Sequence, residues 1–240
     1  MRRERSQETC VESGIGSGRL SIVGVPIGHP DDLTLRALST LRRVDVIAAK
    51  HPRSTQALLS HHGIHAVVTT YDRKNAAEKT PVLLDRLRKG LHIALVSDCG
   101  MPAVYDPGRI LILAAFTARI PVDVIPGPSA VIAGAALCGM DTNAFLFEGR
   151  WSGGLRCMTQ RLESMRSETR TMILLPPAHT LHQLLPLILT TFGNRRIVMA
   201  LDLTKGTQKV IRGRVRTVLA RHSFHDVTAQ LTLIVEGVKG

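Results

Sequence analysis

The sequence predicts an α/β protein made of two α/β domains, the first with a mostly parallel sheet and the second with a mixed sheet. Short apolar runs alternate with helical patterns along residues 19–149, which is typical of a parallel sheet covered by helices. Several of these runs end in loops rich in Gly and Pro. The 240 residues are 44% hydrophobic, which is enough for two modest cores.

The composition changes along the chain and divides it into parts. Residues 1–18 are polar, rich in Gly and Ser and without periodicity, which predicts a flexible extension. Residues 19–149 are the predicted N-terminal domain, RWSGG at 150–154 is the linker, and 155–240 are a basic C-terminal domain. The chain has no apolar run of ~18 residues, so we expect no membrane partner.

The individual elements follow from periodicity and from Gly and Pro breaks. In the first domain, strands are expected near residues 20, 45, 66, 93, 122 and 145, and helices over 34–42, 54–62, 82–89 and 110–118. In the second domain, helices are expected over 158–165 and 215–221, and strands over 171–175, 196–203, 209–213 and 231–235.

The central loop of the first domain lies within IALVSDCGMPAVYDPG, residues 93–108. Four apolar residues form a buried strand, which ends at Ser97 and Asp98. In open α/β sheets small molecules bind outside the carboxyl ends of strands, and glycines such as Gly100 and Gly108 let a ligand approach the main chain. A purely structural turn is the alternative interpretation.

Two further loops have the same form. In VGVPIGHPDDLTLRAL, residues 23–38, Asp31 or Asp32 is expected to cap the helix that Leu33 opens. This loop lacks the glycine spacing of a nucleotide phosphate cradle. In VIPGPSAVIAGAAL, residues 124–137, Ser129 is expected to cap a helix of small residues, against which a flat ligand or another backbone can lie.

Together these segments resemble the tetrapyrrole methylase superfamily, and within it the ribosomal RNA small subunit methyltransferase I family. The family's TPIGNLxDITLRAL, VSDAGTPxISDPG and PGPSAxxxAL are similar to VPIGHPDDLTLRAL, VSDCGMPAVYDPG and PGPSAVIAGAAL here. FLFEGR at 145–150 is similar to the end of the family's first domain, and LDLTKGTQKVIRG at 201–213 to its ELTKxHEEVxRG segment. The resemblance covers residues 19–237.

The resemblance implies an S-adenosylmethionine (SAM) site in a cleft between the domains, bound mostly by main chain. The matching positions are Pro26, Ile27, Gly28, Asp98, Cys99, Gly100, Met101, Val104, Ser129, Ala130, Leu175, Pro176, Pro177 and the strand Ala200, Leu201 to Leu203. It also implies methylation of a cytidine ribose 2′-hydroxyl in small-subunit ribosomal RNA, and a homodimer. Transfer to a hydroxyl needs a group that takes its proton, and the candidates are Asp98, Asp32, Asp106 and Lys205.

This chain departs from the family pattern at several charged positions. Lys50 and His51 replace the acidic pair of the family's EDTR, PPAHT at 176–180 replaces ESPHR, and Thr207, Gln208 and Lys209 replace HEE. These changes favour a methylation rate below that of a typical member. They leave open an RNA-binding ribosome-assembly factor without activity. A tetrapyrrole C-methyltransferase is a third hypothesis, although its GxGPGD first loop is absent.

The net charge of +12 is concentrated in the last 90 residues, which carry 13 Lys and Arg against 5 Asp and Glu. Such an excess favours a polyanionic partner, and here a small-subunit ribosomal RNA or pre-ribosomal particle. The candidate RNA contacts are Arg53, Arg195, Arg196, Lys205 and Arg212, with solvated surface as the alternative for the Arg195 and Arg196 pair. With eight aromatic residues, no stacking platform for bases is visible.

The remaining chemistry-bearing residues favour no metal. His61, His62 and His65 in HHGIH, and the pair His179 and His182, are conceivable ligands, but solvated positions at helix ends explain them as well. The four cysteines lack metal or disulfide spacing, which is typical of a reducing compartment. We expect a cytoplasmic protein. A mitochondrial location is the alternative, although the acidic residues of the extension argue against a transit peptide.

Overall fold

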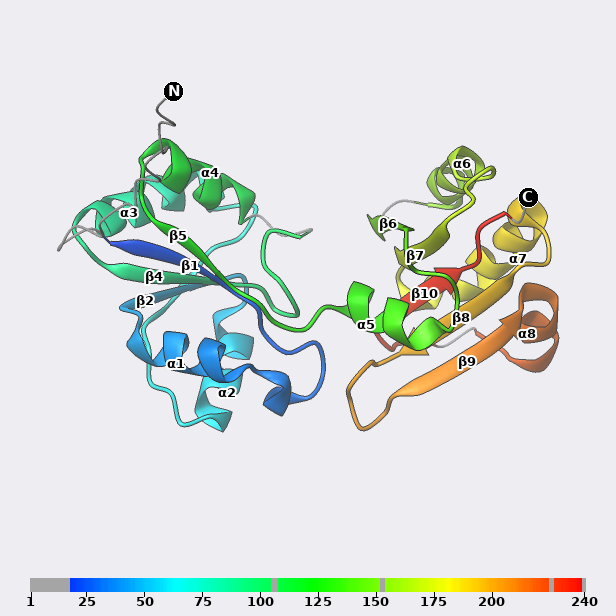
Figure 1. Cartoon of the computed structure of the whole chain (residues 1–240), viewed down its shortest axis with the longest axis horizontal. Helices are drawn as coiled ribbons and strands as arrows, with labels where there is room; N and C mark the ends of the chain where they lie inside the picture. Colours follow the sequence, from blue (N-terminus) through cyan, green and yellow to red (C-terminus); the bar gives the residue numbers. More distant parts are fainter. Residues whose placement is uncertain (1–17, 105–107, 152–153, 225–226, 239–240) are drawn as a thin grey trace, which may run out of the picture.

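The computed structural model describes residues 18–104, 108–151, 154–224 and 227–238. They form two α/β halves joined through α5 (Figure 1). The expected flexible extension lies outside the described residues except for Gly18, which packs against the end of α3. None of the described helices is long and apolar enough to cross a membrane.

The first half contains an all-parallel sheet in the order β3-β2-β4-β1-β5. Its strands are β1 (Arg19–Val23), β2 (Val46–Ala49), β3 (Val68–Thr70), β4 (His92–Val96) and β5 (Val122–Ile125). Side chains of successive residues in β4 alternate between two cores, with Ile93 and Leu95 on one face and Ala94 and Val96 on the other. This confirms the predicted parallel architecture.

Helices cover both faces of this sheet (Figure 1). α1 (Leu35–Arg43) and α2 (Pro52–His61) pack on one face, and α3 (Ala76–Arg88) and α4 (Arg109–Thr117) on the other. The short 3₁₀ helix η1 (Pro30–Asp32) precedes α1. The expected carboxylate cap of α1 is wrong. Asp31 and Asp32 lie within η1, and Thr34 caps α1, its Oγ1 accepting from the Ala37 N–H at 3.1 Å.

The second half contains a mixed sheet in the order β6-β7-β10-β8-β9. Its strands are β6 (Phe145–Arg150), β7 (Thr171–Leu175), β8 (Arg196–Leu201), β9 (Lys209–Arg214) and β10 (Leu231–Val235). β6 and β7 are parallel, and the other pairs are antiparallel. The predicted mixed sheet is confirmed, and β7 and β8 run in the same direction on either side of β10.

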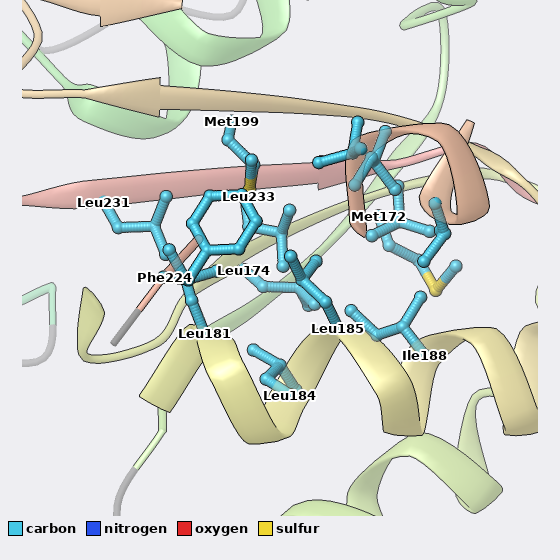
Figure 2. Packing of buried hydrophobic residues seen from close by; sticks show 14 of the residues in the cluster. Met172, Leu174, Leu181, Leu184, Leu185, Ile188, Met199, Phe224, Leu231 and Leu233 are labelled. Carbon is cyan, nitrogen blue, oxygen red and sulfur yellow. The ribbon is translucent and has the colours of Figure 1, made fainter. Parts of the chain in front are cut away.

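The larger core of this half lies between the sheet and the helices α6 (Leu155–Ser164), α7 (Leu181–Phe192) and α8 (Val215–Arg221). Leu181, Leu184, Leu185 and Ile188 of α7 point toward Met172, Leu174, Met199 and Leu233 of the strands (Figure 2). The short helix η2 (Ala178–Thr180) leads into α7. α7 was not predicted, although its buried residues recur at helical spacing.

Residues 145–150 do not belong to the first sheet, contrary to the sequence-based expectation. They form β6, which pairs with β7 in the second sheet. α5 (Ala130–Cys138) also packs on the second sheet, since a Cβ on Gly134 would lie 2.8 Å from Thr232 Cγ2 of β10. Trp151, in the expected linker, is 3% exposed in the second core. The structure therefore favours a division between β5 and α5.

Candidate functional site

Three loops at the carboxyl ends of β1, β4 and β5 meet through their backbones, and we call residues 24–28, 97–101 and 126–129 the loop cluster. Val25 N–H donates to Gly100 O at 3.0 Å, and Gly100 N–H donates to Val25 O at 3.2 Å. A Cβ on Gly24 would lie 2.7 Å from Gly127 Cα, so the first and third loops approach as closely as glycines allow. Gly100 has φ +77°, a conformation that glycine adopts readily.

Side chains of the central loop reinforce this arrangement. Ser97 is buried, and its Oγ donates to Gly100 O at 2.9 Å. Cys99 Sγ lies 3.5 Å from Ile27 O. Ser129 caps α5 as predicted, its Oγ accepting from the Ile132 N–H at 3.5 Å. The three motifs recognised in the sequence are thus adjacent in space.

The second half contacts the loop cluster directly. His29 N–H donates to Thr204 Oγ1 at 2.9 Å, and a Cβ on Gly28 would collide with Leu203 O and lie 2.5 Å from Thr204 Oγ1. Ile27 packs in an apolar cluster with Ala200 and Leu203, joined by the partly buried Cys99, Ala130, Ala133 and Leu137. This apolar cluster therefore contains predicted donor-binding residues from both halves.

The contacting segment of the second half is the loop 202–208 between β8 and β9. Lys205 Nζ lies 2.7 Å from Asp202 Oδ1, a hydrogen bond that lowers the pKa of the Asp202 carboxyl. Gln208 Oε1 accepts from the Thr204 N–H at 2.7 Å, and Thr207 Oγ1 lies 3.1 Å from Asp202 Oδ2. Asp202 and Thr204 have φ of +49° and +65°, which costs about 1–3 kcal/mol each, so these side-chain bonds hold a strained loop.

The other predicted donor-binding positions are more dispersed. Leu174 of β7 and Met199 of β8 both pair with Leu233 of β10, so β7 and β8 are level with each other in the sheet. The segment Leu175, Pro176 and Pro177 therefore lies at the same edge of the sheet as the end of β8. Leu201 belongs to the large second core. Met101 contacts the Gly24 position through its sulfur, and Val104 is 56% exposed. These residues therefore differ in burial and lie on different elements.

Asp98 has two basic neighbours that sequence reasoning counted only as departures. His51 Nδ1 lies 2.7 Å from Asp98 Oδ2, and Lys50 Nζ lies 3.6 Å from the same oxygen. Lys50 and His51 follow β2, Asp98 follows β4, and these two strands are paired. An ionised carboxylate only accepts hydrogen bonds, so the His51 ring donates from Nδ1, and in the neutral form of this ring Nε2 carries the lone pair. The His51 side chain is 62% exposed.

The other candidate catalytic residues differ in accessibility. Asp32 Oδ2 is shielded from solvent and has no hydrogen-bond partner within the described parts of the chain. Asp106 lies outside the described residues. Lys205 is paired with Asp202 beside Gly28. Of the described candidates, Asp98 lies beside an imidazole and Lys205 beside a carboxylate.

The candidate RNA contacts fall into two sets. Arg53 is exposed at the start of α2, on the same edge as the loop cluster, and Lys205 contacts that cluster. Arg212 is exposed on β9 and donates to Leu137 O at 2.8 Å. Arg195 and Arg196 lie at the opposite end of β8 from the loop 202–208, and both are engaged within the second half.

The engagement of Arg195 and Arg196 is extensive. Arg195 donates to the backbone carbonyls of Phe192, Arg166 and Glu236, and its partial burial lowers the pKa of the guanidinium. Arg196 Nη2 lies 2.8 Å from Glu236 Oε1, and this hydrogen bond raises the pKa of Arg196. These contacts stabilise the second half, so binding of RNA phosphates by either residue has to compete with them.

A basic surface cavity of about 390 Å³ lies beside β5, an edge strand of the first sheet. Arg19, Arg36 and Arg43 line it together with His92. Arg19 is paired with Asp123 at 2.6 Å. Arg36 and Arg43 are seven residues apart on α1, about two helical turns, so both lie on the same side of the helix. No sequence motif indicated this grouping.

The cysteines and one histidine pair add no further site. Cys99, Cys138 and Cys157 form no disulfide among the described residues, and Cys10 lies outside them. His182 Nδ1 lies 2.9 Å from His179 O, which is a local hydrogen bond at the start of α7.

Comparisons with known proteins place this geometry in a family. Residues 19–219 match the family described as Tetrapyrrole (Corrin/Porphyrin) Methylases. The chain is 34% identical over 220 residues to ribosomal RNA small subunit methyltransferase I of Thermotoga maritima, covering 92% of this chain and 99% of that protein. It is 38% identical over 221 residues to the protein of the same name in Synechocystis, covering 92% of this chain and 79% of that one.

Solved structures show the same fold at low sequence identity. The methyltransferase CobJ matches with a TM-score of 0.68 and 17% identity, over 92% of this chain and 94% of its own. Uroporphyrin-III C-methyl transferase from Thermus thermophilus, complexed with S-adenyl homocysteine, matches with a TM-score of 0.62 and 18% identity, over 92% and 97%. The chain belongs to the tetrapyrrole methylase family and, within it, to the group of ribosomal RNA small subunit methyltransferase I proteins.

Proposed function

We propose that this protein is a SAM-dependent methyltransferase that modifies a ribose 2′-hydroxyl of small-subunit ribosomal RNA. The observation that carries the proposal is the joining of the three loop motifs with the loop 202–208 at Gly28. Relatives named ribosomal RNA small subunit methyltransferase I match this chain over more than nine-tenths of its length.

The loop cluster and the second-half loop are suited to hold SAM. Gly100 leaves room beside its main chain, since an added Cβ would meet no atom nearer than 3.4 Å, and a ligand is expected at this carboxyl edge of a parallel sheet. Gly28 and Gly127 instead let the loops pack closely against Leu203 and Gly24. Around the buried Ile27 and Ala200, the partly buried Ala130, Ala133 and Leu137 provide an apolar surface of small area for the nonpolar parts of the donor. When bound, SAM supplies an electrophilic methyl group on a sulfonium.

His51 is the group best placed to take the proton of the ribose hydroxyl. Asp98 holds its ring through Nδ1 at 2.7 Å, which orients the ring and leaves Nε2 to accept a proton. Asp98 then stabilises the imidazolium, as a carboxylate does for a histidine base in general. The replacement of two acidic residues by Lys50 and His51 thus exchanges one type of proton acceptor for another.

The RNA is proposed to contact basic groups on both halves. Arg53 and Lys205 lie close to the proposed donor site, and Arg36 and Arg43 line the cavity beside β5. Arg212, Arg195 and Arg196 remain candidates on the second half. Because the chain has few aromatic side chains, phosphate contacts and shape are expected to dominate recognition.

A ribosome-assembly factor without activity is the second candidate, favoured by Lys50 and His51 in place of carboxylates. The two candidates predict opposite results for one variant. If the carboxylates are needed, Lys50→Glu/His51→Asp raises activity. If His51 is the base, the same variant lowers it. The tetrapyrrole C-methyltransferase hypothesis has only the shared fold in its favour.

The test combines donor binding with methyl transfer. Calorimetric titration with SAM measures binding, and labelled SAM with small-subunit particles that lack the modification measures transfer. We expect binding and label in the RNA ribose. Donor binding without any label in RNA would favour the assembly factor, and failure to bind SAM would contradict both the donor site and the enzyme.

Two further properties stay predictions. A homodimer can be tested by light scattering, and the exposed Ile110, Leu113 and Phe116 on α4 are a candidate contact surface. Phe116→Glu should then yield monomers. A cytoplasmic location fits the bacterial relatives, and these give no support to the mitochondrial alternative.

A further inference from the structure

Three potential metal ligands lie close together in the first half, outside the loop cluster. They are Asp31, His61 and His62, and one ligand atom from each lies within 4.8 Å of the others. His61 Nε2 lies 2.9 Å from Asp31 Oδ1, and His62 Nε2 lies 3.0 Å from Pro30 O. Both imidazoles therefore direct the same ring nitrogen toward the 3₁₀ turn η1.

The convergence of two consecutive histidines has a local cause. Neighbouring side chains on an α-helix point about 100° apart, because the helix has 3.6 residues per turn. His61 is the last residue of α2, whereas His62 is its C-cap with φ −98° and ψ 11°. The chain leaves the helix between them, and the two rings meet edge to face with centroids 4.8 Å apart.

The ligand positions are fixed by further hydrogen bonds. The His62 N–H donates to Leu59 O at 3.1 Å, and its carbonyl accepts from Arg42 Nη2 at 3.4 Å. The Asp31 N–H donates to His29 Nδ1 at 3.2 Å, which holds the aspartate in the turn. A set of ligands positioned in this way loses less entropy when it binds an ion.

We propose that Asp31, His61 and His62 bind a first-row divalent transition metal such as Zn²⁺ or Co²⁺. Two imidazole nitrogens and one carboxylate suit these ions, whereas Mg²⁺ and Ca²⁺ prefer oxygen ligands. Water completes the coordination, since the side chains of Asp31 and His61 are 66% and 48% exposed. On binding, each Nε2 coordinates the metal and the ring proton resides on Nδ1.

The grouping differs from the one that the sequence suggested. In HHGIH the conceivable set was His61, His62 and His65, but the structure brings Asp31 to the first two, and His65 is not a member. Asp31 follows Gly28 closely in the chain. A metal would therefore tie the segment after the first loop to the end of α2, thirty residues away along the sequence.

The experiment uses the full chain without a histidine tag, first treated with EDTA and then dialysed. Co²⁺ is titrated while the visible absorption of the ion is followed, and Zn²⁺ is titrated by calorimetry. We expect one ion per chain and a higher melting temperature with metal. His61→Gln should weaken binding at least about 100-fold, beyond the ~10–100-fold that loss of a second-shell partner costs. His65→Gln is the matched control and should bind like wild type.

Asp31→Asn is the second variant and is used if His61→Gln proves unstable. It keeps the size of the side chain, so the fold should be preserved. It should also lose affinity, while His179→Gln should not. Absence of binding to the wild-type protein at micromolar Zn²⁺ would overturn the site. Equal affinity of His61→Gln and wild type would overturn it as well. SAM binding is measured in the same samples. A failure of the proposed methyltransferase function is thereby distinguished from a failure of the metal site.

Discussion

The loop cluster of the first half and the loop 202–208 of the second half meet at one place but are built differently. In the first half the loops are joined mainly by backbone, through the Val25 and Gly100 pair and the close approach of Gly24 and Gly127. In the second half the loop is shaped mainly by side chains, through Asp202, Lys205 and Gln208.

The difference determines which changes each region tolerates. A backbone-built site is sensitive to any added Cβ, because the close contacts leave no room for one. A loop held by side chains is sensitive to loss of polar groups, each worth about 1 kcal/mol. The motifs of the first half are therefore rich in Gly and Pro, whereas the segment 201–213 of the second half is recognised by polar residues, several of which differ from the family pattern.

The largest expected effect is on kcat, and it distinguishes the chemical role of the first half from that of the loop 202–208. His51→Gln should lower kcat by roughly 10²- to 10⁴-fold, because the amide cannot accept the hydroxyl proton. Lys205→Gln, on the second-half loop, should lower kcat by much less. Transfer from labelled SAM to small-subunit particles measures both.

Donor affinity is the control for this pair of variants. His51→Gln should bind SAM like wild type. A larger loss of kcat in Lys205→Gln than in His51→Gln would place the chemistry on the second half and contradict the assignment of the base.

The next effect tests the contact between the two regions. Gly28→Ala places a Cβ against Leu203 O and Thr204 Oγ1, and overpacking of this kind costs about 1–3 kcal/mol. SAM binding should weaken by roughly 5- to 150-fold, measured by calorimetry. Gly206→Ala is the matched control, since a Cβ there meets nothing within 4 Å. Equal affinities of the two variants would show that the donor does not depend on this contact.

A smaller effect is expected where the second-half loop loses one polar group. Gln208→Ala removes the acceptor of the Thr204 N–H, which costs about 1 kcal/mol and should weaken SAM binding about 5-fold. Lys209→Ala, at the next position, has an exposed side chain and should leave affinity unchanged. If Gln208→Ala also binds normally, the strained backbone of the loop is held by other contacts.

The sequence was sufficient to predict most of the fold. Apolar runs and helical periods identified every strand of the first sheet. The three inner strands β1, β2 and β4 are buried on both faces and form short hydrophobic runs. The sheet to which 145–150 belongs was not predictable, since FLFEGR is an equally good strand in either sheet. Pairing with β7 depends on long-range contacts that no local pattern records.

The parts of the candidate site that are formed by backbone were predictable from the sequence. The contacts between side chains from different strands were not. The three Gly and Pro loops were recognised, and the structure brings them together. The approach of His51 to Asp98, 47 residues apart, depends on the pairing of β2 with β4. Thr207 and Gln208, counted as lost charges, have a role only in the conformation of the loop 202–208.

Salt dependence of RNA binding compares basic residues near the site with those far from it. Arg53→Gln should reduce the slope of log affinity against log salt by ~0.7, the value for one single-stranded phosphate contact. Arg196→Gln should leave the slope unchanged, because Arg196 is paired with Glu236, and lower stability by at most about 1 kcal/mol. A reduced slope in Arg196→Gln would instead confirm the RNA role predicted from the sequence.

The last prediction concerns the pH dependence of stability and tests whether the two halves unfold together. His92 lies in β4 with Nε2 2.7 Å from Ser21 Oγ, and burial is the main cause that lowers its pKa from 6.5. The unfolded chain therefore binds more protons as the pH falls below 6.5, so this part of the stability is present above that pH and is lost as the pH falls. The slope that one such group contributes is at most about 1.4 kcal/mol per pH unit.

His92→Gln should flatten the dependence of the unfolding free energy on pH between 7 and 5, while His65→Gln, at an exposed position, should not. Urea unfolding is followed by circular dichroism for the whole chain and by fluorescence of Trp151, the only tryptophan, which lies in the second core. Because Ile27 packs with Ala200 and Leu203 across the two halves, we expect both signals to flatten alike. A change seen only by circular dichroism would mean that the halves unfold separately and that the contact at Gly28 forms without coupling them.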